Sequence, residues 1–308
     1  MAKRMIYFIV NPASGSGRAA AVVPMIRKRL DAHNAAYEIV ATDKPDDFAR
    51  VSASIDFDKA ETLACVGGDG TVQEYIGLAV RHDVNFAIVP VGSGNDFIYS
   101  TPEGGCKFRS LEDRTAFYTD KILRKKTIAT DAVAIKGNRG DGCVEQYFYN
   151  IGGTGIDIEV LKDAIPLKKF IGSSAYFVSL IKNAVTYRTE EITLTVDGRS
   201  ETGHFLLLAV SNGAYYGGHL HIAPPARIDD GLITLCTVKK MARPKLMALF
   251  PAVKPGMHTK FKEVSFVDCT RVDLAFSGTR TINLDGNLFD YESPLTFEIL
   301  KNAVRLIV

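Results

Sequence analysis

The chain has 308 residues, a formal net charge of +2 and a hydrophobic fraction of 46%. This length is sufficient for two domains with cores of their own, and the composition is that of a soluble globular protein. The nearly balanced charge and the lack of any helix-turn-helix or RNA-binding signature argue against a nucleic-acid partner. The cysteines are scattered without a C-x-x-C pair, which favours free thiols in a reducing compartment over a zinc site.

Two further observations bear on where the protein works. No apolar run approaches the roughly 20 residues that a membrane-spanning helix needs. The N-terminal apolar stretch, Met5 to Val10, is too short for a signal peptide. We therefore expect a cytoplasmic protein, and the sequence does not decide between a monomer and a homodimer.

The first part of the chain alternates strands and helices. Apolar runs predict strands at 5–10, 37–41, 63–66 and 86–89, and helical spacing predicts helices at about 18–33, 45–55, 71–82 and 111–125. Three of the strands lead into loops of small residues, at 11–17, 67–71 and 90–97. In an open parallel sheet such loops emerge at the carboxyl edge, where ligands bind.

The second loop, Gly67-Gly68-Asp69-Gly70-Thr71, lies between a buried strand and a helix for which Thr71 is the predicted cap. Its glycines let the backbone approach a ligand, and the start of the helix offers unpaired N–H groups, an arrangement that suits phosphate. Because Asp69 would repel a phosphate, a cation between the two is required, and Mg²⁺ fits best.

Beyond residue 127 the pattern changes to short alternating runs, which predict a mostly antiparallel β domain with hairpin turns at 137–142 and 197–198. Two helices, at about 157–164 and 173–187, interrupt it, and the final strands are predicted at 295–300 and 303–308. We place the domains at 1–127 and 128–294, with 295–308 assigned to the first.

Six motifs, in order along nearly the whole chain, resemble those of diacylglycerol kinases and their bacterial lipid-kinase relatives, a group that includes sphingosine and ceramide kinases. The motifs are Asn11-Pro-x-Ser-Gly15, Gly67-Gly-Asp-Gly-Thr71, Pro90-x-Gly-Ser-x-Asn-Asp-Phe97, Asn150-Ile-Gly-Gly-x-Gly155, Ala223-Pro224 to Asp229-Asp-Gly-Leu232, and Asn283-Leu-Asp-Gly286. The second motif by itself is not specific for this group, because NAD kinases and some phosphofructokinases share it. The six motifs together are specific.

The resemblance implies a parallel α/β domain of the NAD-kinase and diacylglycerol-kinase type, a mostly antiparallel β domain, and a cleft between them where lipid meets ATP. It implies nucleotide contacts from Asn11, Ser14, Gly15, Thr42, Gly67, Gly68, Asp69, Gly70, Thr71 and Asn95. Asp69, Asp96 and Asp131 would organise a catalytic Mg²⁺, partly through water. Asp285 would take the proton from the attacking hydroxyl. A structural Mg²⁺ would bind Asp230 and the carbonyls of Arg227 and Leu232.

Two positions depart from the family pattern. Asn287 stands where the family usually has Glu, and Ile98-Tyr99 stand where an Arg often follows. We therefore keep three hypotheses: a lipid kinase with diacylglycerol as the first candidate substrate, a kinase of a non-lipid hydroxyl such as NAD kinase, and a pseudokinase that binds nucleotide or lipid.

A basic segment, 239–262, contains seven Lys or Arg residues and no acidic ones, interleaved with apolar side chains. Such a segment suits an anionic membrane surface, so we expect peripheral membrane association during lipid phosphorylation. The alternating pair His219 and His221 is compatible with a metal site, but the lack of a third ligand nearby favours ordinary loop residues.

Overall fold

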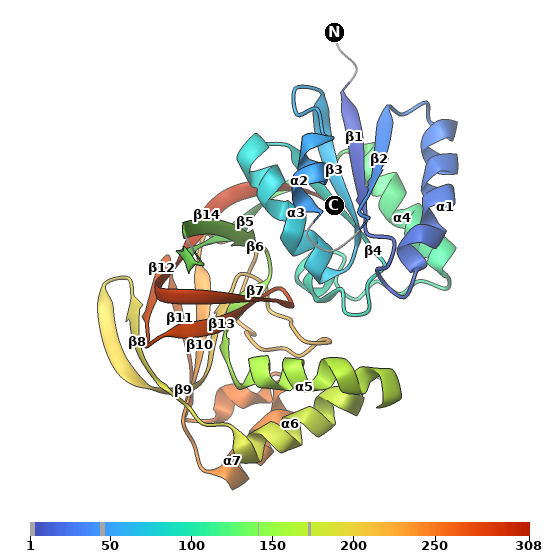
Figure 1. The fold of residues 1–308 in the computed structure, drawn as a ribbon. Coiled ribbons are helices and arrows are strands. Elements are labelled where there is room, and N and C mark those ends of the chain that lie inside the picture. The colour runs from blue at the N-terminus through green and yellow to red at the C-terminus, as the bar shows by residue number, and fades with distance from the viewer. Residues whose placement is uncertain (1–3, 44–46, 141, 172–173) are drawn as a thin grey trace. The chain divides into compact units, whose positions relative to one another are not determined.

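The computed structural model describes residues 4–43, 47–140, 142–171 and 174–308 (Figure 1). The chain forms two compact units. The first comprises residues 1–132 with 228–230 and 300–308, and the second comprises 133–227 and 231–299. The backbone therefore passes between the units four times, whereas the sequence suggested two passages, at 127/128 and 294/295.

The first unit is a parallel sheet with helices on both faces (Figure 1). Its strands lie in the order β2-β1-β3-β4, and the end of β14 adds beside β4, also in parallel. Helices α1 and α4 cover one face, and α2 and α3 cover the other. The bounds are β1 Met5–Val10, α1 Arg18–Ala32, β2 Tyr37–Ala41, α2 Phe48–Ala53, β3 Ala60–Gly67, α3 Asp69–His82, β4 Asn85–Pro90, the 3₁₀ helix η1 Asp96–Ser100, and α4 Leu111–Arg124.

Helical spacing explains how α1 packs on the sheet. Its side chains at positions 19, 22, 26 and 30 are fully buried and meet Tyr118 and Ile122 of α4. Each large apolar side chain buried in this way stabilises the unit by about 1.5–3 kcal/mol. Ser110 caps α4 by accepting a hydrogen bond of 3.0 Å from the N–H of Asp113.

The prediction that Thr71 caps α3 is wrong. The helix begins two residues earlier, at Asp69, because Gly68 takes an extended conformation that ends the strand and opens the helix without a side-chain cap. Asp69 therefore lies in the first turn, where the helix dipole favours a carboxylate. Thr71 lies inside the helix, buried, and its hydroxyl accepts a hydrogen bond from the Asn11 amide at 3.4 Å. The helix predicted at 45–55 is confined to α2, and residues 45 and 46 lie outside the described residues.

The second unit is built mostly from antiparallel strands (Figure 1). They are β5 Thr127–Arg139, β6 Gly142–Phe148, β7 Ile151–Gly155, β8 Glu191–Val196, β9 Arg199–Ser211, β10 Ile233–Lys239, β11 Val264–Cys269, β12 Arg271–Ala275, β13 Thr279–Leu284 and β14 Asn287–Ile307. A run of neighbours in the order β11-β10-β9-β7-β13-β14 forms the main path, and β12 joins β14 to β8. The predicted two-residue turn at Asp197-Gly198 joins β8 to β9.

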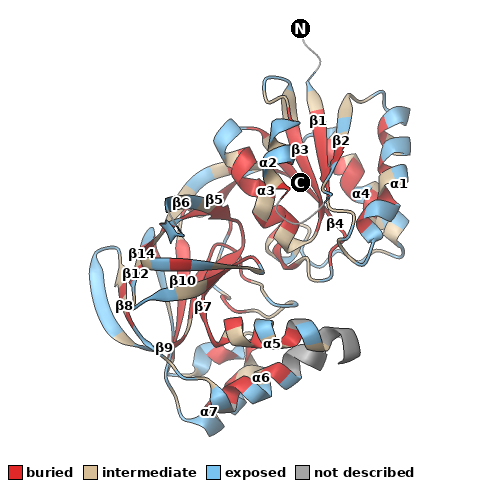
Figure 2. Ribbon diagram, in the orientation of Figure 1, coloured by how far each residue is buried: buried red, intermediate tan, exposed pale blue. Residues whose placement is uncertain are grey.

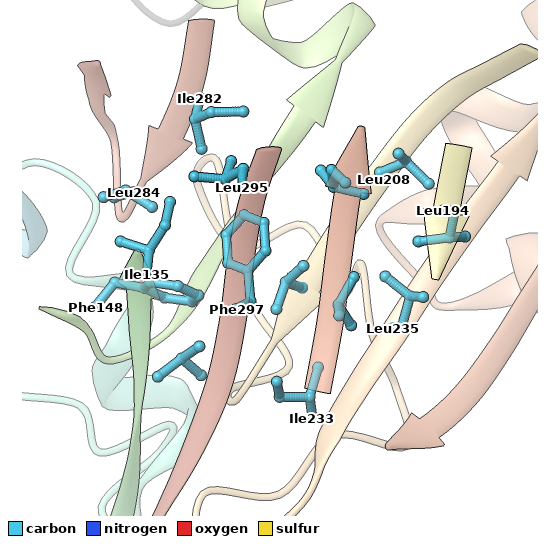
Figure 3. Close-up of a cluster of buried hydrophobic side chains, with 14 of the residues drawn as sticks. Ile135, Phe148, Leu194, Leu208, Ile233, Leu235, Ile282, Leu284, Leu295 and Phe297 are labelled. Atoms are coloured by element: carbon cyan, nitrogen blue, oxygen red, sulfur yellow. The ribbon is translucent and has the colours of Figure 1, made fainter. Parts of the chain in front are cut away.

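The core of this unit is a layer of aliphatic and aromatic side chains from most of its strands (Figure 3). Phe148 and Phe297 meet edge to face, with ring centroids 6.1 Å apart. On β10 the side chains alternate, so that Ile233 and Leu235 enter this core while Cys236 and Val238 enter a second cluster beneath the helices. Both faces of the central strands are therefore buried.

The final two strands of the prediction are one strand of 21 residues, β14. Asn302, in the gap between the two predicted strands, has a positive φ of 55°. Its N–H nevertheless donates to the Asp131 carboxylate at 2.7 Å. This bond supports the strand where it passes from the second unit into the first.

Among its described residues, the second unit also contains the helices α5 Ile156–Ile171, α6 Ser174–Thr186 and α7 Arg243–Val253, followed by the 3₁₀ helix η2 Met257–Lys260. Helix α5 extends beyond the predicted end at residue 164, and α7 was not predicted as a helix. The buried residues of these helices are red in Figure 2, and these faces pack on the second apolar cluster. In the described parts of the chain, no helix is both long and apolar enough to cross a bilayer.

Candidate functional site

The three glycine loops meet at the carboxyl edge of β1, β3 and β4, as the sequence predicts. A Cβ atom on Gly15 would lie 1.9 Å from the carbonyl oxygen of Val91, so the first loop lies directly against the third. A Cβ atom on Gly92 would lie 2.4 Å from the Cα of Gly68, which brings the third loop against the second. Only glycine permits backbones to approach this closely.

Side chains tie the loops together as well. Arg18, the first residue of α1, donates from Nε to the Gly15 carbonyl and from Nη2 to the Gly92 carbonyl, each at 2.9 Å. The Asn95 amide donates to the same Gly92 oxygen at 2.9 Å. Sequence reasoning did not select Arg18, although its place directly after a glycine loop, at a helix start, could have indicated it.

Asp69 joins the second loop to the third. Its carboxylate accepts hydrogen bonds from the backbone N–H groups of Asn95, at 2.8 Å, and Phe97, at 3.3 Å. Burial, and secondly the negative charge of Asp96, raise the pKa of Asp69 to about 6. The neighbouring carboxylates converge beside Gly94, where an added Cβ atom would lie 3.0 Å from Asp69 Oδ2 and 3.4 Å from Asp96 Oδ2.

This pair of carboxylates fits Mg²⁺. Two buried acids facing one another repel, and a divalent cation between them would remove the repulsion. In the described residues no group of three acidic, His or Cys side chains is arranged to hold a metal. One or two carboxylates are what Mg²⁺ commonly takes from a protein when phosphates and waters supply its other ligands.

Asp131 is fully buried at a different place in the first unit. Its carboxylate accepts the Asn302 N–H, and its own N–H donates to the Ile228 carbonyl at 2.7 Å. It does not join Asp69 and Asp96 in a three-carboxylate group among the described residues. A contribution of Asp131 to Mg²⁺ through water stays a prediction.

The other predicted nucleotide contacts fall into two groups. Asn11, Ser14, Gly67, Gly70 and Thr71 belong to the interlocked loops or to the first turn of α3. Thr42 lies at the same sheet edge, since its N–H donates to the Val10 carbonyl at 2.8 Å, but it follows the outer strand β2.

Asp285 lies in the two-residue turn that joins β13 to β14. Both Asp285 and Gly286 have positive φ, 49° and 98°, which defines the tight turn type that matches the twist of a hairpin. The Asp285 carboxylate is buried and accepts the backbone N–H groups of Tyr149, Asn150 and Ile151 at 2.8, 3.0 and 2.8 Å. These bonds fix the orientation of the carboxylate. Asn287 follows as the first residue of β14 and pairs with Leu284.

The remaining predicted positions lie in loops of the chain between β9 and β10. Arg227 and Leu232 belong to the second unit and Asp230 to the first, so the predicted structural metal site stays a prediction. The His221 ring stacks on Tyr215 with centroids 4.5 Å apart, which accounts for this histidine without a metal.

The structure thus combines a parallel α/β unit, whose interlocked glycine loops and paired carboxylates suit a phosphate and a cation, with an antiparallel unit that carries an Asp at a hairpin turn. Residues 5–135 match the diacylglycerol kinase catalytic domain, and residues 151–308 match the YegS C-terminal NAD kinase beta sandwich-like domain. The chain therefore belongs to the diacylglycerol kinase and YegS-like family of kinases. Membership in a kinase family implies that ATP is the phosphoryl donor.

Individual proteins that are similar to this chain are named as diacylglycerol kinases as well. The diacylglycerol kinase of Mycobacterium tuberculosis is 27% identical over 293 residues, which cover 94% of this chain and 90% of that protein. The diacylglycerol kinase of Bacillus subtilis is 26% identical over 289 residues, covering 92% and 88%.

Solved structures show the same fold. A crystal structure of a diacylglycerol kinase from Bacillus anthracis matches with a TM-score of 0.75 and 21% identity, covering 99% of this chain and 96% of that one. Yeast NADH kinase, solved in complex with NADH, matches with a TM-score of 0.52 and 11% identity, covering 99% and 83%. The fold thus extends to kinases of quite different hydroxyl substrates.

Proposed function

We propose that the protein transfers the γ-phosphoryl group of ATP to the hydroxyl group of a lipid, with diacylglycerol as the first candidate. The observation that supports this most strongly is the contact between the three glycine loops beside the Asp69 and Asp96 carboxylates. Backbone N–H groups and the start of α3 suit phosphate, and the paired acids suit Mg²⁺.

The roles of the residues follow from the chemistry of phosphoryl transfer. The loops around Gly15, Gly68 and Gly92 hold the phosphates of ATP, and Arg18 keeps the first and third loops together. Mg²⁺, when bound at Asp69 and Asp96, neutralises phosphate charge and orients the γ-phosphoryl group. Asp285 accepts the proton of the lipid hydroxyl as that oxygen bonds to the γ-phosphorus, while the bond from this phosphorus to the oxygen of the β-phosphate breaks and ADP leaves. The three hydrogen bonds from backbone N–H groups to the Asp285 carboxylate hold it in one orientation for this step.

The non-lipid alternative draws support from the likeness to yeast NADH kinase, but that likeness concerns the fold alone. The curated relatives over most of the chain are instead named diacylglycerol kinases. A direct assay that tests lipids and NAD separately under the same conditions identifies the substrate.

We also propose that the second unit docks on anionic membranes through the basic segment 239–262. The structure modifies the sequence argument in two ways. Leu246, Leu249 and Val253 are buried in the core, so they do not form a membrane face. Lys239 forms an ion pair with Glu201, and Lys245 forms one with Glu263.

Besides Lys239, which is exposed but ion-paired, five basic side chains of the segment are exposed, together with Met247 and Met257, which are 39% and 50% exposed. The five are Lys240, Arg243, Lys254, Lys260 and Lys262. Each basic residue near an anionic surface contributes about 1 kcal/mol of attraction. Vesicle flotation tests the proposal: reversing Lys254 and Lys260 to Glu should abolish binding to phosphatidylglycerol vesicles, and undiminished flotation of that variant would refute it.

The central experiment incubates the protein with γ-labelled ATP, Mg²⁺, a panel of lipid alcohols and, separately, NAD. We expect labelled lipid, and we expect Asp69→Asn to remove the label while leaving the Asn95 N–H with an acceptor oxygen. Asp58→Asn, at an exposed position of the same unit, is the matched control. Labelled NAD without labelled lipid would establish the non-lipid kinase, and nucleotide binding without transfer to any acceptor would establish a pseudokinase.

A further inference from the structure

A chain of hydrogen bonds runs from the Asp285 turn into the helical side of the second unit. The Gly286 N–H donates to Asn283 Oδ1 at 2.8 Å, and the Asn283 amide donates in turn to the Tyr216 hydroxyl. The Tyr216 hydroxyl donates to Asp157 Oδ2 at 3.2 Å. All three bonds point the same way and end on a carboxylate, which strengthens each of them.

We call the hydrogen-bonded side chains of Asn283, Tyr216 and Asp157 the relay. They come from segments that are far apart in sequence. Asp157 lies in the first turn of α5, Tyr216 in the loop after β9, and Asn283 on β13. On β13, Ile282 and Leu284 point into the strand core, so Asn283 points to the opposite face and is itself only 2% exposed. Asn283 is therefore directed away from the main core and toward Tyr216.

The relay is suited to holding neighbouring residues in position and not to binding substrate. Asp157, Tyr216 and Asn283 border a cavity of about 30 Å³, which has room for little more than a water molecule. Asp157 retains some exposed surface as a residue, but its Oδ1 atom is enclosed. Burial raises the pKa of Asp157, while its bonds with Tyr216 and Asn283 act in the opposite direction.

The turn that the relay reaches needs such support. Asp285 has a positive φ of 49°, which costs about 1 kcal/mol or more for a residue other than glycine. On one side, the N–H groups of residues 149–151 hold the Asp285 carboxylate. On the other side, Asn283 Oδ1 accepts the Gly286 N–H. The Asn150 side-chain amide also donates to the carbonyl of Tyr215, next to Tyr216, and so links residues 149–151 to the loop that carries Tyr216.

We propose that Asp157 and Tyr216 are positioning residues, which hold the Asp285-Gly286 turn in place through Asn283 without touching substrate. The catalytic part of this inference rests on the proposed function, in which Asp285 accepts the proton of the lipid hydroxyl. The structural part does not, because the relay acts on the turn whether or not the turn performs catalysis.

The test compares variants that break the relay with matched controls. Tyr216→Phe removes the central hydroxyl and keeps the ring, and Asp157→Leu removes the terminal acceptor at similar volume. Tyr291→Phe is the control, since it removes the hydroxyl of a fully buried ring in the same unit, one that donates to Gln146, away from the relay. Asp157→Asn retains an acceptor oxygen and should restore much of what Asp157→Leu loses.

Two readouts are needed. Hydrogen exchange followed by mass spectrometry should show about tenfold faster exchange of the peptide around residue 286 in Tyr216→Phe and Asp157→Leu, but not in Tyr291→Phe. Lipid phosphorylation should show kcat reduced about tenfold with the Kd for ATP within twofold of the wild-type value. If Asp157→Leu does not fold, Tyr216→Phe decides alone.

The outcomes separate the two hypotheses. Exchange and kcat within twofold of wild type in both relay variants, or equal losses in Tyr291→Phe, would overturn the positioning role. If the wild-type protein phosphorylates no lipid, the proposed function fails, and the exchange measurement still decides whether the relay holds the turn.

Discussion

Gly15 and Gly17 offer a direct test of the interlocked loops. Both have positive φ, 62° and 88°, so alanine is strained at either position by a similar amount, about 1–2 kcal/mol. They differ in what the new methyl group would meet. At Gly17 nothing lies within 4 Å, whereas at Gly15 the methyl carbon would lie 1.9 Å from the Val91 carbonyl oxygen.

The clash sets the size of the expected effect. An ordinary contact begins at 3.4 Å, so Gly15→Ala must move the first loop about 1.5 Å from the third. Overpacking of this kind costs a further ~1–3 kcal/mol. A displacement of about 1 Å in a catalytic site can reduce the rate by about 100-fold. We expect Gly15→Ala to weaken ATP binding at least tenfold, and Gly17→Ala to weaken it less than threefold.

Isothermal titration with ATP and Mg²⁺ measures the affinities, and thermal unfolding of each variant measures the shared cost of the strained backbone. Gly15→Ala should melt several degrees below Gly17→Ala, because only the former carries the clash. Equal ATP affinities in the two variants would refute the reasoning, since they would show that contact between the first and third loops does not shape the site.

Two further predictions concern the paired acids. Gly94→Ala places a methyl group 3.0 Å from Asp69 Oδ2 and 3.4 Å from Asp96 Oδ2, so the Mg²⁺ concentration for half-maximal activity should rise at least fivefold, and an unchanged value would show that the cation does not lie there. The pKa of Asp69 is raised from 3.8 to about 6, so without metal the folded state keeps a proton that the unfolded state loses. Stability should therefore fall as the pH rises from about 4 to 6, by on the order of 3 kcal/mol, as urea unfolding would measure. Asp69→Asn should flatten this dependence, and a slope equal to that of wild type would contradict the assignment.

The parallel unit was largely predictable because its signals are local. Strands buried on both faces form continuous apolar runs, and each of β1, β3 and β4 is followed by small residues that mark the loop. The start of α3 was misplaced because capping preferences favour Thr71, whereas the helix is opened by Gly68 and stabilised by Asp69 in its first turn. The contact between Gly15 and Val91 joins loops separated by 76 positions, and a sequence carries no local sign of it.

The second unit shows where local patterns fail. The segment 239–262 combines basic and apolar side chains in a pattern that suits a membrane surface, but its apolar side chains at 246, 249 and 253 pack in the core of the unit. The relay from Asn283 through Tyr216 to Asp157 joins residues up to 126 positions apart, and each residue alone is typical of a loop, a helix start or a strand. Such a network becomes visible only when the fold brings the segments together.

Substitution of Asn287 tests whether the chain is an active kinase or a pseudokinase. It is the first residue of β14, directly after the Asp285-Gly286 turn, and it pairs with Leu284 on β13. A Glu at this position would place a second negative charge near Asp285, and repulsion between like charges would make proton uptake by Asp285 easier. Asn can offer a hydrogen bond but no such charge.

We therefore compare Asn287→Glu with Asn287→Gln, which has the same length and no charge. If the natural chain is an active kinase, Asn287→Glu should leave kcat for lipid phosphorylation within about threefold or lower it, because the site already functions with a neutral side chain. If the natural chain transfers no phosphoryl group and activity appears in Asn287→Glu but not in Asn287→Gln, the missing carboxylate prevents proton removal, and the natural chain is a pseudokinase. A gain shared by both variants would instead assign the effect to side-chain length.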